Sequence, residues 1–213
     1  MTINLCACLI VLLGSFLGLE SPLTVTQMLW VNLIMDTFAA MALSSLPADR
    51  KVLNDKPRKW DSHIVNRPML GRIVGVGLLF FVLLAGLWQL LWHADITSVR
   101  DLMTGDALIS FFKGFADFSH SSDLSGKELG IFFSIFVMLQ FWNLFNAKYY
   151  RTDRSLILDF VDLFRNPKKV KESFSAGFIW ISLVIVLGQI LIVTFAGPLF
   201  NVSRLSFSDW MWM

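Results

Sequence analysis

The stretch Gln27-Met-Leu-Trp-Val-Asn-Leu-Ile-Met-Asp-Thr-Phe-Ala-Ala-Met-Ala-Leu43 is predominantly hydrophobic, yet it carries an amide, Asn32, and a carboxylate, Asp36, near its middle. The pattern predicts a helix. Because the two residues are four positions apart, their side chains lie on one face of that helix about one turn apart. Amide and carboxylate oxygens presented together suit a hard cation. A carboxylate at the centre of a bilayer costs about 2.5 to 3.5 kcal/mol on insertion scales, so Asp36 is expected to face a cavity or a partner. We therefore predict a cation pathway built on this helix.

The composition of the whole chain indicates a membrane protein. Of its 213 residues, 55% are hydrophobic and only 16% are charged, and the mean hydropathy is +0.63. An ordinary soluble domain has a larger charged fraction. The net charge is +2, and no nucleic-acid partner is expected. Cys6 and Cys8 both fall in the first apolar block, where we interpret them as small buried residues rather than as a disulfide or a metal pair.

The apolar residues form blocks close to the length of about 20 residues that spans a bilayer. We predict an all-α polytopic transmembrane bundle that forms one domain over residues 1–213. The first block has no basic region and no cleavage site of the kind that precedes a secreted protein, so it is interpreted as a span whose beginning has been cut away. The predicted spans are residues 2–19, 23–46, 69–93, 129–147 and 174–196, with the start of a sixth from Phe207.

The distribution of basic residues predicts how the spans are oriented. Residues 47–68 contain six Lys and Arg, and residues 148–173 contain seven, whereas residues 94–128 contain three against six acidic residues. Lys and Arg gather in cytoplasmic loops. Residues 47–68 and 148–173 are therefore expected on the cytoplasmic side, and residues 94–128 on the outside. This sidedness is consistent with five spans that alternate in direction.

A few further polar residues fall within the predicted spans. They are Asn4 in the first span, Gln140, Asn143 and Asn146 in the fourth, and Gln189 in the fifth; for Asn146 and Gln189 we favour hydrogen bonding between helices. The three in the fourth span recur every three residues, so they lie within about a third of the helix circumference and could line one cavity. Ca²⁺ prefers six to eight oxygen ligands, and Asn32, Asp36 and one or two amides do not reach that number. Part of the predicted site is therefore missing from the chain.

Several segments of this sequence are similar to those of a known protein family. The motif from Gln27 to Thr37 is similar to the sixth transmembrane helix of P-type calcium-transporting ATPases, and closest to the plasma-membrane type. Supporting matches are Leu5 to Phe16 for the end of the fifth helix, Gln140-x-x-Asn-x-x-Asn146 for the eighth, Gln189 to Gly197 for the ninth and Leu205 to Trp210 for the start of the tenth.

The resemblance implies that Asn32 and Asp36 are calcium ligands. It also implies that the site is completed by backbone carbonyls and a Glu from an unwound fourth helix, which this sequence does not contain. Pumps that carry two calcium ions use three further acidic or hydroxyl ligands, and this chain has Ala7, Met35 and Gln140 at those positions. The resemblance therefore implies a single-calcium pump in which Asn4, Gln140 and Asn143 could line the cavity without binding strongly.

The family's Asp-Lys-Thr-Gly-Thr phosphorylation motif does not occur in the sequence. The resemblance implies that ATP and Mg²⁺ act through phosphorylation, nucleotide and actuator domains in the N-terminal part of the pump, so this chain alone is not expected to hydrolyse ATP. The expected partners are those domains, the fourth helix and the lipid bilayer, and the expected location is the plasma membrane.

Three alternatives from other classes remain open at this point. A secondary cation transporter would also place an Asp at mid-membrane, but it should show two related repeats, which the sequence lacks. A non-catalytic membrane subunit or scaffold would explain the missing ATPase core, although it would not require Asn32 and Asp36 on one face. A pump for another cation is the third, because the fourth helix that sets selectivity is not in the sequence.

Overall fold

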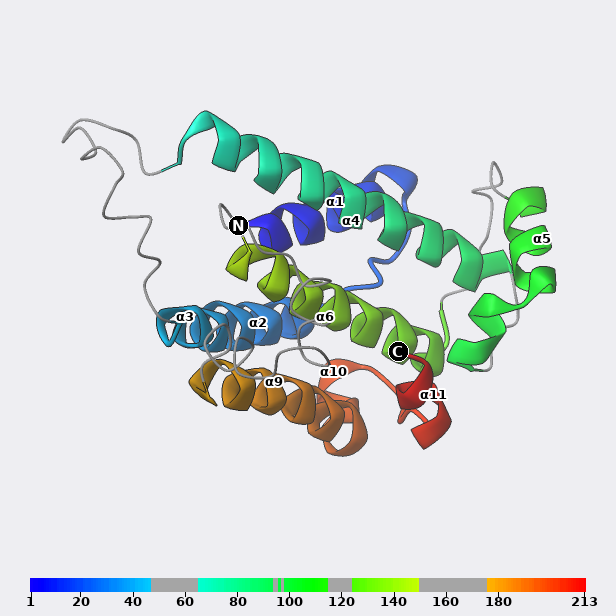
Figure 1. The fold of residues 1–213 in the computed structure, drawn as a ribbon. Helices are drawn as coiled ribbons and strands as arrows, with labels where there is room; N and C mark the ends of the chain where they lie inside the picture. Colours follow the sequence, from blue (N-terminus) through cyan, green and yellow to red (C-terminus); the bar gives the residue numbers. More distant parts are fainter. Residues whose placement is uncertain (47–64, 94–95, 97, 115–123, 150–175) are drawn as a thin grey trace.

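The computed structural model describes residues 1–46, 65–93, 96, 98–114, 124–149 and 176–213, apart from the side chains of Met35, Asp36, Met103, Leu108 and Phe111. The described residues form helices, and no strand occurs among them (Figure 1). The predicted all-α fold is therefore confirmed. The helices are α1 (Thr2–Leu17), α2 (Val25–Val31), the π-helix η1 (Asn32–Asp36), α3 (Thr37–Ser44), α4 (Arg67–His93), the 3-10 helix η3 (Val99–Met103), α5 (Gly105–Gly114), α6 (Gly126–Lys148), α9 (Ala176–Phe195), α10 (Gly197–Phe200) and α11 (Phe207–Trp212).

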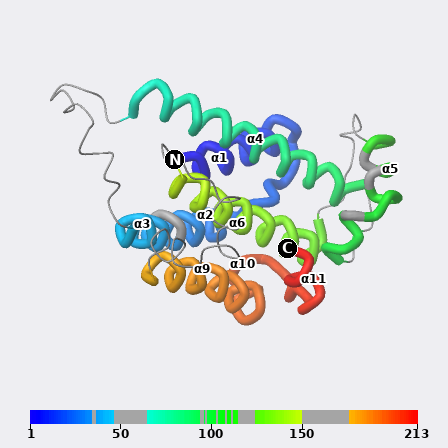
Figure 2. The backbone as a smooth tube through the Cα atoms, viewed as in Figure 1, coloured from blue at the N-terminus to red at the C-terminus, as the bar shows by residue number. Residues whose placement is uncertain are grey.

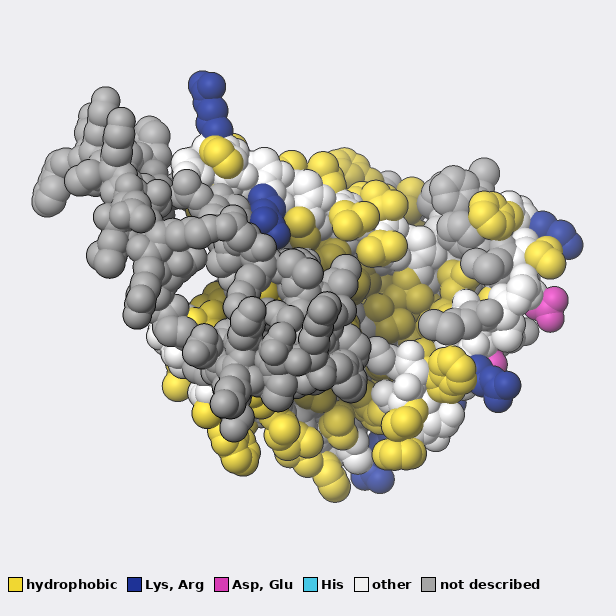
Figure 3. Space-filling view, in the orientation of Figure 1, with side chains coloured by type: hydrophobic (Ala, Val, Ile, Leu, Met, Phe, Trp, Pro, Cys, Tyr) yellow, Lys and Arg dark blue, Asp and Glu magenta, His cyan; other side chains and the backbone are white. Residues whose placement is uncertain are grey.

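Four helical stretches in the described part are long and apolar enough to cross a membrane. They are Val25–Ser44, which joins α2, η1 and α3, and the helices α4, α6 and α9. The first predicted span, residues 2–19, corresponds to α1, which is apolar but only 16 residues long. It ends at Gly18, whose left-handed backbone (φ 69°) a residue without a Cβ adopts readily. Hydrophobic side chains cover much of the described part of the face in the space-filling view, and the acidic side chains coloured on it lie towards the α5 end (Figure 3).

Helix starts follow from local sequence. Thr24 precedes α2, and its hydroxyl accepts a hydrogen bond from the Gln27 N–H while the Gln27 side chain accepts one from the Thr24 N–H. Ser125 and Glu128 form the same reciprocal arrangement at the start of α6. Such a capping box satisfies two backbone donors that a helix would otherwise leave unpaired. The starts of α2 and α6 are therefore encoded by a few residues at each boundary.

The helices lie side by side, with α4 and α9 at opposite edges (Figures 1 and 2). The chain reverses direction after α1, so α2, η1 and α3 run back along the bundle. Helix α1 packs against α4, α3 packs against α9, and α6 contacts both α4 and α9. The short elements η3, α5, α10 and α11 gather at one end of the bundle. The sidedness of that end in a membrane stays a prediction.

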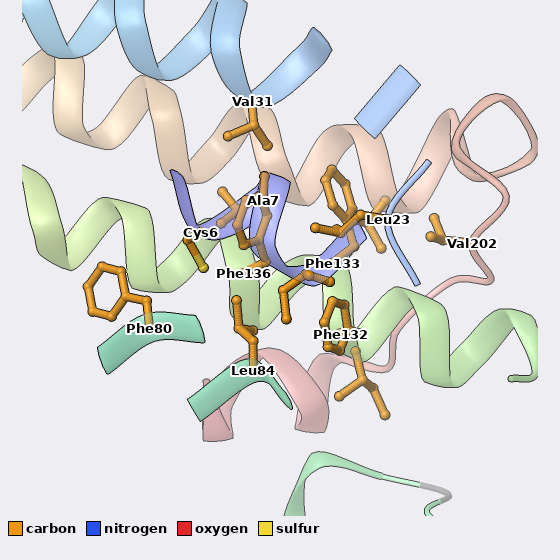
Figure 4. Close-up of a cluster of buried hydrophobic side chains, with 14 of the residues drawn as sticks. Cys6, Ala7, Leu23, Val31, Phe80, Leu84, Phe132, Phe133, Phe136 and Val202 are labelled. Carbon is orange, nitrogen blue, oxygen red and sulfur yellow. The ribbon is translucent and has the colours of Figure 1, made fainter. Parts of the chain in front are cut away.

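The core lies around the first half of α6. Phe132, Phe133 and Phe136 are completely buried, and they meet Cys6 from α1 and Leu84 from α4, which are completely buried as well (Figure 4). Aromatic side chains of this size bury a large apolar area each. Helix α6 is therefore the central element against which the other helices are positioned.

Candidate functional site

The helix that carries the predicted ligands changes geometry at those residues. Helix α2 ends at Val31, the five residues from Asn32 to Asp36 form a π-helix, and α3 continues from Thr37. A π-helix bonds residue i to residue i+5, so its turn is wider than that of an α-helix, and short π segments occur frequently at functional sites. Asn32 and Asp36 therefore mark the two ends of one distorted turn. The side chain of Asp36 lies outside the described residues.

A cavity of about 160 Å³ lies beside this turn. Its polar wall consists of Asn4 and Cys8 from α1 and Asn32 from the start of η1. A space of this size holds several water molecules when polar groups line it. The structure thus brings together Asn4 and Asn32, two of the residues predicted from sequence. The apolar wall consists of Ile3, Ala7, Met28, Val31 and Phe136.

Val31 and Ala7 form part of the apolar wall of this cavity. Val31 extends from α2 towards Ala7 of α1 and Phe136 of α6 (Figure 4), and it is 2% exposed. Ala7 ends at its Cβ, so the space that a longer side chain would fill at this position stays part of the cavity. Ala7 thus lines the cavity at the position where the resemblance implies an acidic residue in pumps that carry two calcium ions.

The remaining predicted site residues lie elsewhere on α6. Asn143 lines a different cavity, of about 300 Å³, between α1, α4 and α6. In that region the Arg72 guanidinium donates to the backbone carbonyl oxygen of Asn146 at 3.3 Å, which ties α4 to α6. Gln140 is 1% exposed and lines neither of these two cavities. Its amide lies one turn from Phe136 along the helix and makes no hydrogen bond to any described residue.

The sequence-based interpretation of the two cysteines is half right. Cys6 is completely buried, as predicted, but Cys8 is exposed and lines the cavity with Asn4 and Asn32. The two residues are two positions apart, so they point about 200° apart on α1. The sequence could have shown that Cys8 lies on the same side of α1 as Asn4, because residues four positions apart share one face of a helix.

The described cavity supplies two amide side chains, which is fewer than the six to eight oxygens of a Ca²⁺ site. The carboxylate of Asp36, one turn along from Asn32, is the only charged side chain between residues 21 and 46. These side chains alone are too few for a Ca²⁺ site, and their role as cation ligands stays a prediction.

Comparison with known proteins decides the family. The family model described as cation transporting ATPase, C-terminus, matches residues 20–213. The chain belongs to this family. The resemblance predicted from the Gln27 to Thr37 motif is therefore confirmed, and the chain is a membrane domain of cation-transporting ATPases.

Individual relatives of this family are plasma membrane calcium pumps. The chain is 33% identical to plasma membrane calcium-transporting ATPase 3 of Homo sapiens over 221 residues, which covers all of this chain and 15% of that protein. It is 31% identical over 212 residues to plasma membrane calcium-transporting ATPase 2 of Oreochromis mossambicus, with all of this chain and 16% of that protein covered. The chain thus spans about 15% of the length of the relatives it matches.

Proposed function

We propose that residues 1–213 are the membrane part of an ATP-driven calcium pump of the plasma membrane, and that Asn32 and Asp36 supply part of its intramembrane calcium site. The observation that supports this most directly is the position of Asn32, which begins a π-helical turn and lines a cavity together with Asn4. The names of the relatives support the choice of calcium as the transported ion and of the plasma membrane as the location.

Each residue has a separate role in the proposed site. The Asn32 amide oxygen is a neutral ligand, and the Asp36 carboxylate is the ligand that offsets the charge of Ca²⁺, which is the substrate. A carboxylate left without a cation inside a membrane is costly. Asp36 therefore takes up a proton when calcium leaves, so proton countertransport accompanies calcium transport. Asn4 lines the vacated second site without strong binding. Gln140 was expected there as well, but it lines neither of the two cavities, and Asn143 lines the other one, so neither is proposed as a strong ligand.

The rest of the pump completes the machinery. A fourth helix supplies backbone carbonyls and a Glu to the site, and ATP and Mg²⁺ act in phosphorylation, nucleotide and actuator domains that this sequence does not contain. Residues 47–68 are proposed to contact the phosphorylation domain on the cytoplasmic side. Most of that connection lies outside the described residues.

The test uses the full-length pump in membrane vesicles. ATP-driven uptake of radioactive calcium and calcium-dependent phosphoenzyme formation are measured for Asp36→Asn and Asn32→Ala. Ser44→Ala is the matched control on the same helix, because its hydroxyl is exposed and donates to the Met41 carbonyl oxygen of its own turn. We expect Asp36→Asn to abolish uptake, Asn32→Ala to raise the calcium concentration needed for half-maximal uptake, and Ser44→Ala to change neither.

Two other results would each favour a rival. Unchanged uptake in Asp36→Asn and Asn32→Ala would remove both residues from the site and favour a scaffold role. Phosphoenzyme formation that depends on a cation other than calcium would keep the pump assignment and replace its substrate.

A further inference from the structure

We propose that Gln27 is a positioning residue for the calcium site: its buried side chain holds the first turn of α2 on Phe200 and thereby sets where Asn32 lies in the cavity. This inference rests on the proposed function. Gln27 begins the Gln27 to Thr37 motif, but it is not among the residues that line the cavity.

The side chain of Gln27 is completely buried and uses both ends of its amide. Its Oε1 accepts a hydrogen bond from the Thr24 N–H at 3.0 Å, and its Nε2 donates to the backbone carbonyl oxygen of Phe200 at 2.7 Å. Phe200 is the last residue of α10, 173 positions further along the chain. A buried hydrogen bond is costly to break, because the group left behind has no water to replace its partner. Gln27 therefore joins the start of α2 firmly to α10.

The ring of Phe200 reinforces the same connection. It lies edge-on to Trp30 with 6.1 Å between ring centroids and stacks on Phe133 at 6.0 Å with 17° between the planes. Trp30 is three residues after Gln27, so Phe200 contacts two successive turns of α2. Phe133 is three residues before Phe136, which lines the same cavity as Asn32. One residue of α10 thus fixes α2 relative to the helix that forms another wall of the cavity.

The other end of the ligand-bearing helix is held by the same part of the chain. Helix α3 packs along α9, and α10 follows α9 after Ala196. The π-helical turn that begins at Asn32 lies between these two attachments. Since Asn32 is five residues from Gln27, about 7.5 Å along the axis, a small rotation of α2 at its first turn moves the Asn32 side chain. Ion ligands must be held within about 0.5 Å of their productive position.

Gln27 differs from the other buried glutamines. The side chains of Gln89, Gln140 and Gln189 are also buried, and none of them hydrogen-bonds to another residue in the part of the chain that the structure describes. Gln89, in α4, is therefore a matched control: replacing it removes a buried amide of the same size without removing a hydrogen bond between described residues.

The experiment compares Gln27→Met with Gln89→Met in the full-length pump. Methionine keeps the approximate volume of the side chain but loses both hydrogen bonds. Calcium uptake is measured against free calcium, so that the half-saturating concentration and the maximal rate are obtained separately. We expect Gln27→Met to raise the half-saturating concentration about threefold to tenfold, which corresponds to losing about one buried hydrogen bond, with little change in maximal rate. Gln89→Met should change neither quantity.

Thr24→Val separates positioning from helix capping, because it removes the hydroxyl that caps α2 but leaves the bond from Gln27 to Phe200 in place. We expect it to leave the half-saturating calcium concentration unchanged. If Gln27→Met does not reach the membrane, Phe200→Leu tests the same attachment, since it removes the ring contacts with Trp30 and Phe133 and should also raise the half-saturating calcium concentration.

The outcomes distinguish this inference from the proposed function. If Asn32→Ala weakens calcium binding and Gln27→Met behaves like Gln89→Met, Gln27 is not a positioning residue and the calcium site stands. An equal effect of Thr24→Val and Gln27→Met would also overturn the inference, in favour of helix capping. If Asp36→Asn and Asn32→Ala both leave uptake unchanged, the proposed function itself fails.

Discussion

The carboxylate of Asp209 accepts a hydrogen bond from the backbone N–H of Val99 at 3.0 Å, across 110 residues of sequence. Its second oxygen accepts from the Ser206 N–H at 2.9 Å, at the start of α11. Asp209 is 1% exposed, so both bonds are shielded from water. This one side chain joins the last helix to η3, in the long connection between α4 and α6.

Removing this carboxylate should loosen that end of the bundle. Asp209→Ala leaves the N–H groups of Val99 and Ser206 without their acceptor, and hydrogen bonds to charged groups contribute about 1.5 to 3 kcal/mol. We expect a loss of stability of about that size, measured as a lower thermal unfolding temperature of the full-length pump in detergent. Asp106→Ala, at an exposed position in the first turn of α5, is the control. Equal unfolding temperatures for the two variants would contradict a structural role for Asp209.

A second prediction concerns glycine in α6. A Cβ added at Gly130 would lie 2.9 Å from the backbone carbonyl oxygen of Ser203, whereas a Cβ added at Gly75 in α4 meets nothing within 4 Å. Gly130→Ala must push the Ser203 segment away, and overpacking of this kind costs about 1 to 3 kcal/mol. Gly75→Ala should be neutral or stabilise the helix by up to about 1 kcal/mol. Thermal unfolding of the two variants checks this order, and a stable Gly130→Ala variant would show that the segment yields without cost.

The fold class could be predicted from the sequence because apolar blocks of bilayer-spanning length favour helices whatever their partners. The hypothesis of a cation pathway came from Asn32 and Asp36, since a carboxylate in an apolar helix needs a polar environment, and it stays a prediction. The π-helical turn between those residues could not be predicted, because its five residues have no compositional signal that separates them from an α-helix.

The sequence also does not predict which polar side chains pack against one another in the fold. A spacing of three residues placed Gln140 and Asn143 on neighbouring parts of one helix, but the packing of α1 and α4 assigns Asn143 to a different cavity from Asn4. The bond from Gln27 to Phe200 joins residues 173 positions apart, and no local pattern encodes such a pair. Sequence thus predicts which residues are polar within a span, and tertiary packing decides which of them meet.

This difference between the two cavities predicts different effects on calcium affinity. Asn4→Ala removes an amide from the cavity that Asn32 lines, so we expect the half-saturating calcium concentration of the full-length pump to rise about twofold to tenfold, the range for one lost hydrogen-bonding group. Asn143→Ala acts from the other cavity and should have the smaller effect. Ser15→Ala, in α1, is the control, because its hydroxyl bonds to the Val11 carbonyl oxygen of its own helix. A larger effect of Asn143→Ala would relocate the site towards α4.

Cys8 offers a direct test of whether the cavity lies on the ion path. A small cationic methanethiosulfonate reagent reacts with a thiolate to form a mixed disulfide and release a sulfinate, and only accessible thiols react. Because Cys8 lines the cavity and Cys6 is completely buried, we expect the reagent to inhibit calcium uptake in the wild-type and Cys6→Ala pumps. Cys8→Ala should resist inhibition, and calcium present during labelling should slow the reaction by occupying the neighbouring site.

Two results would contradict this expectation. If Cys8→Ala is inhibited as strongly as the wild type, the reagent acts at another residue. If Cys8 reacts at the same rate with and without calcium, the cavity is open to water but lies apart from the bound ion, and Asn32 would then face a space that calcium does not enter.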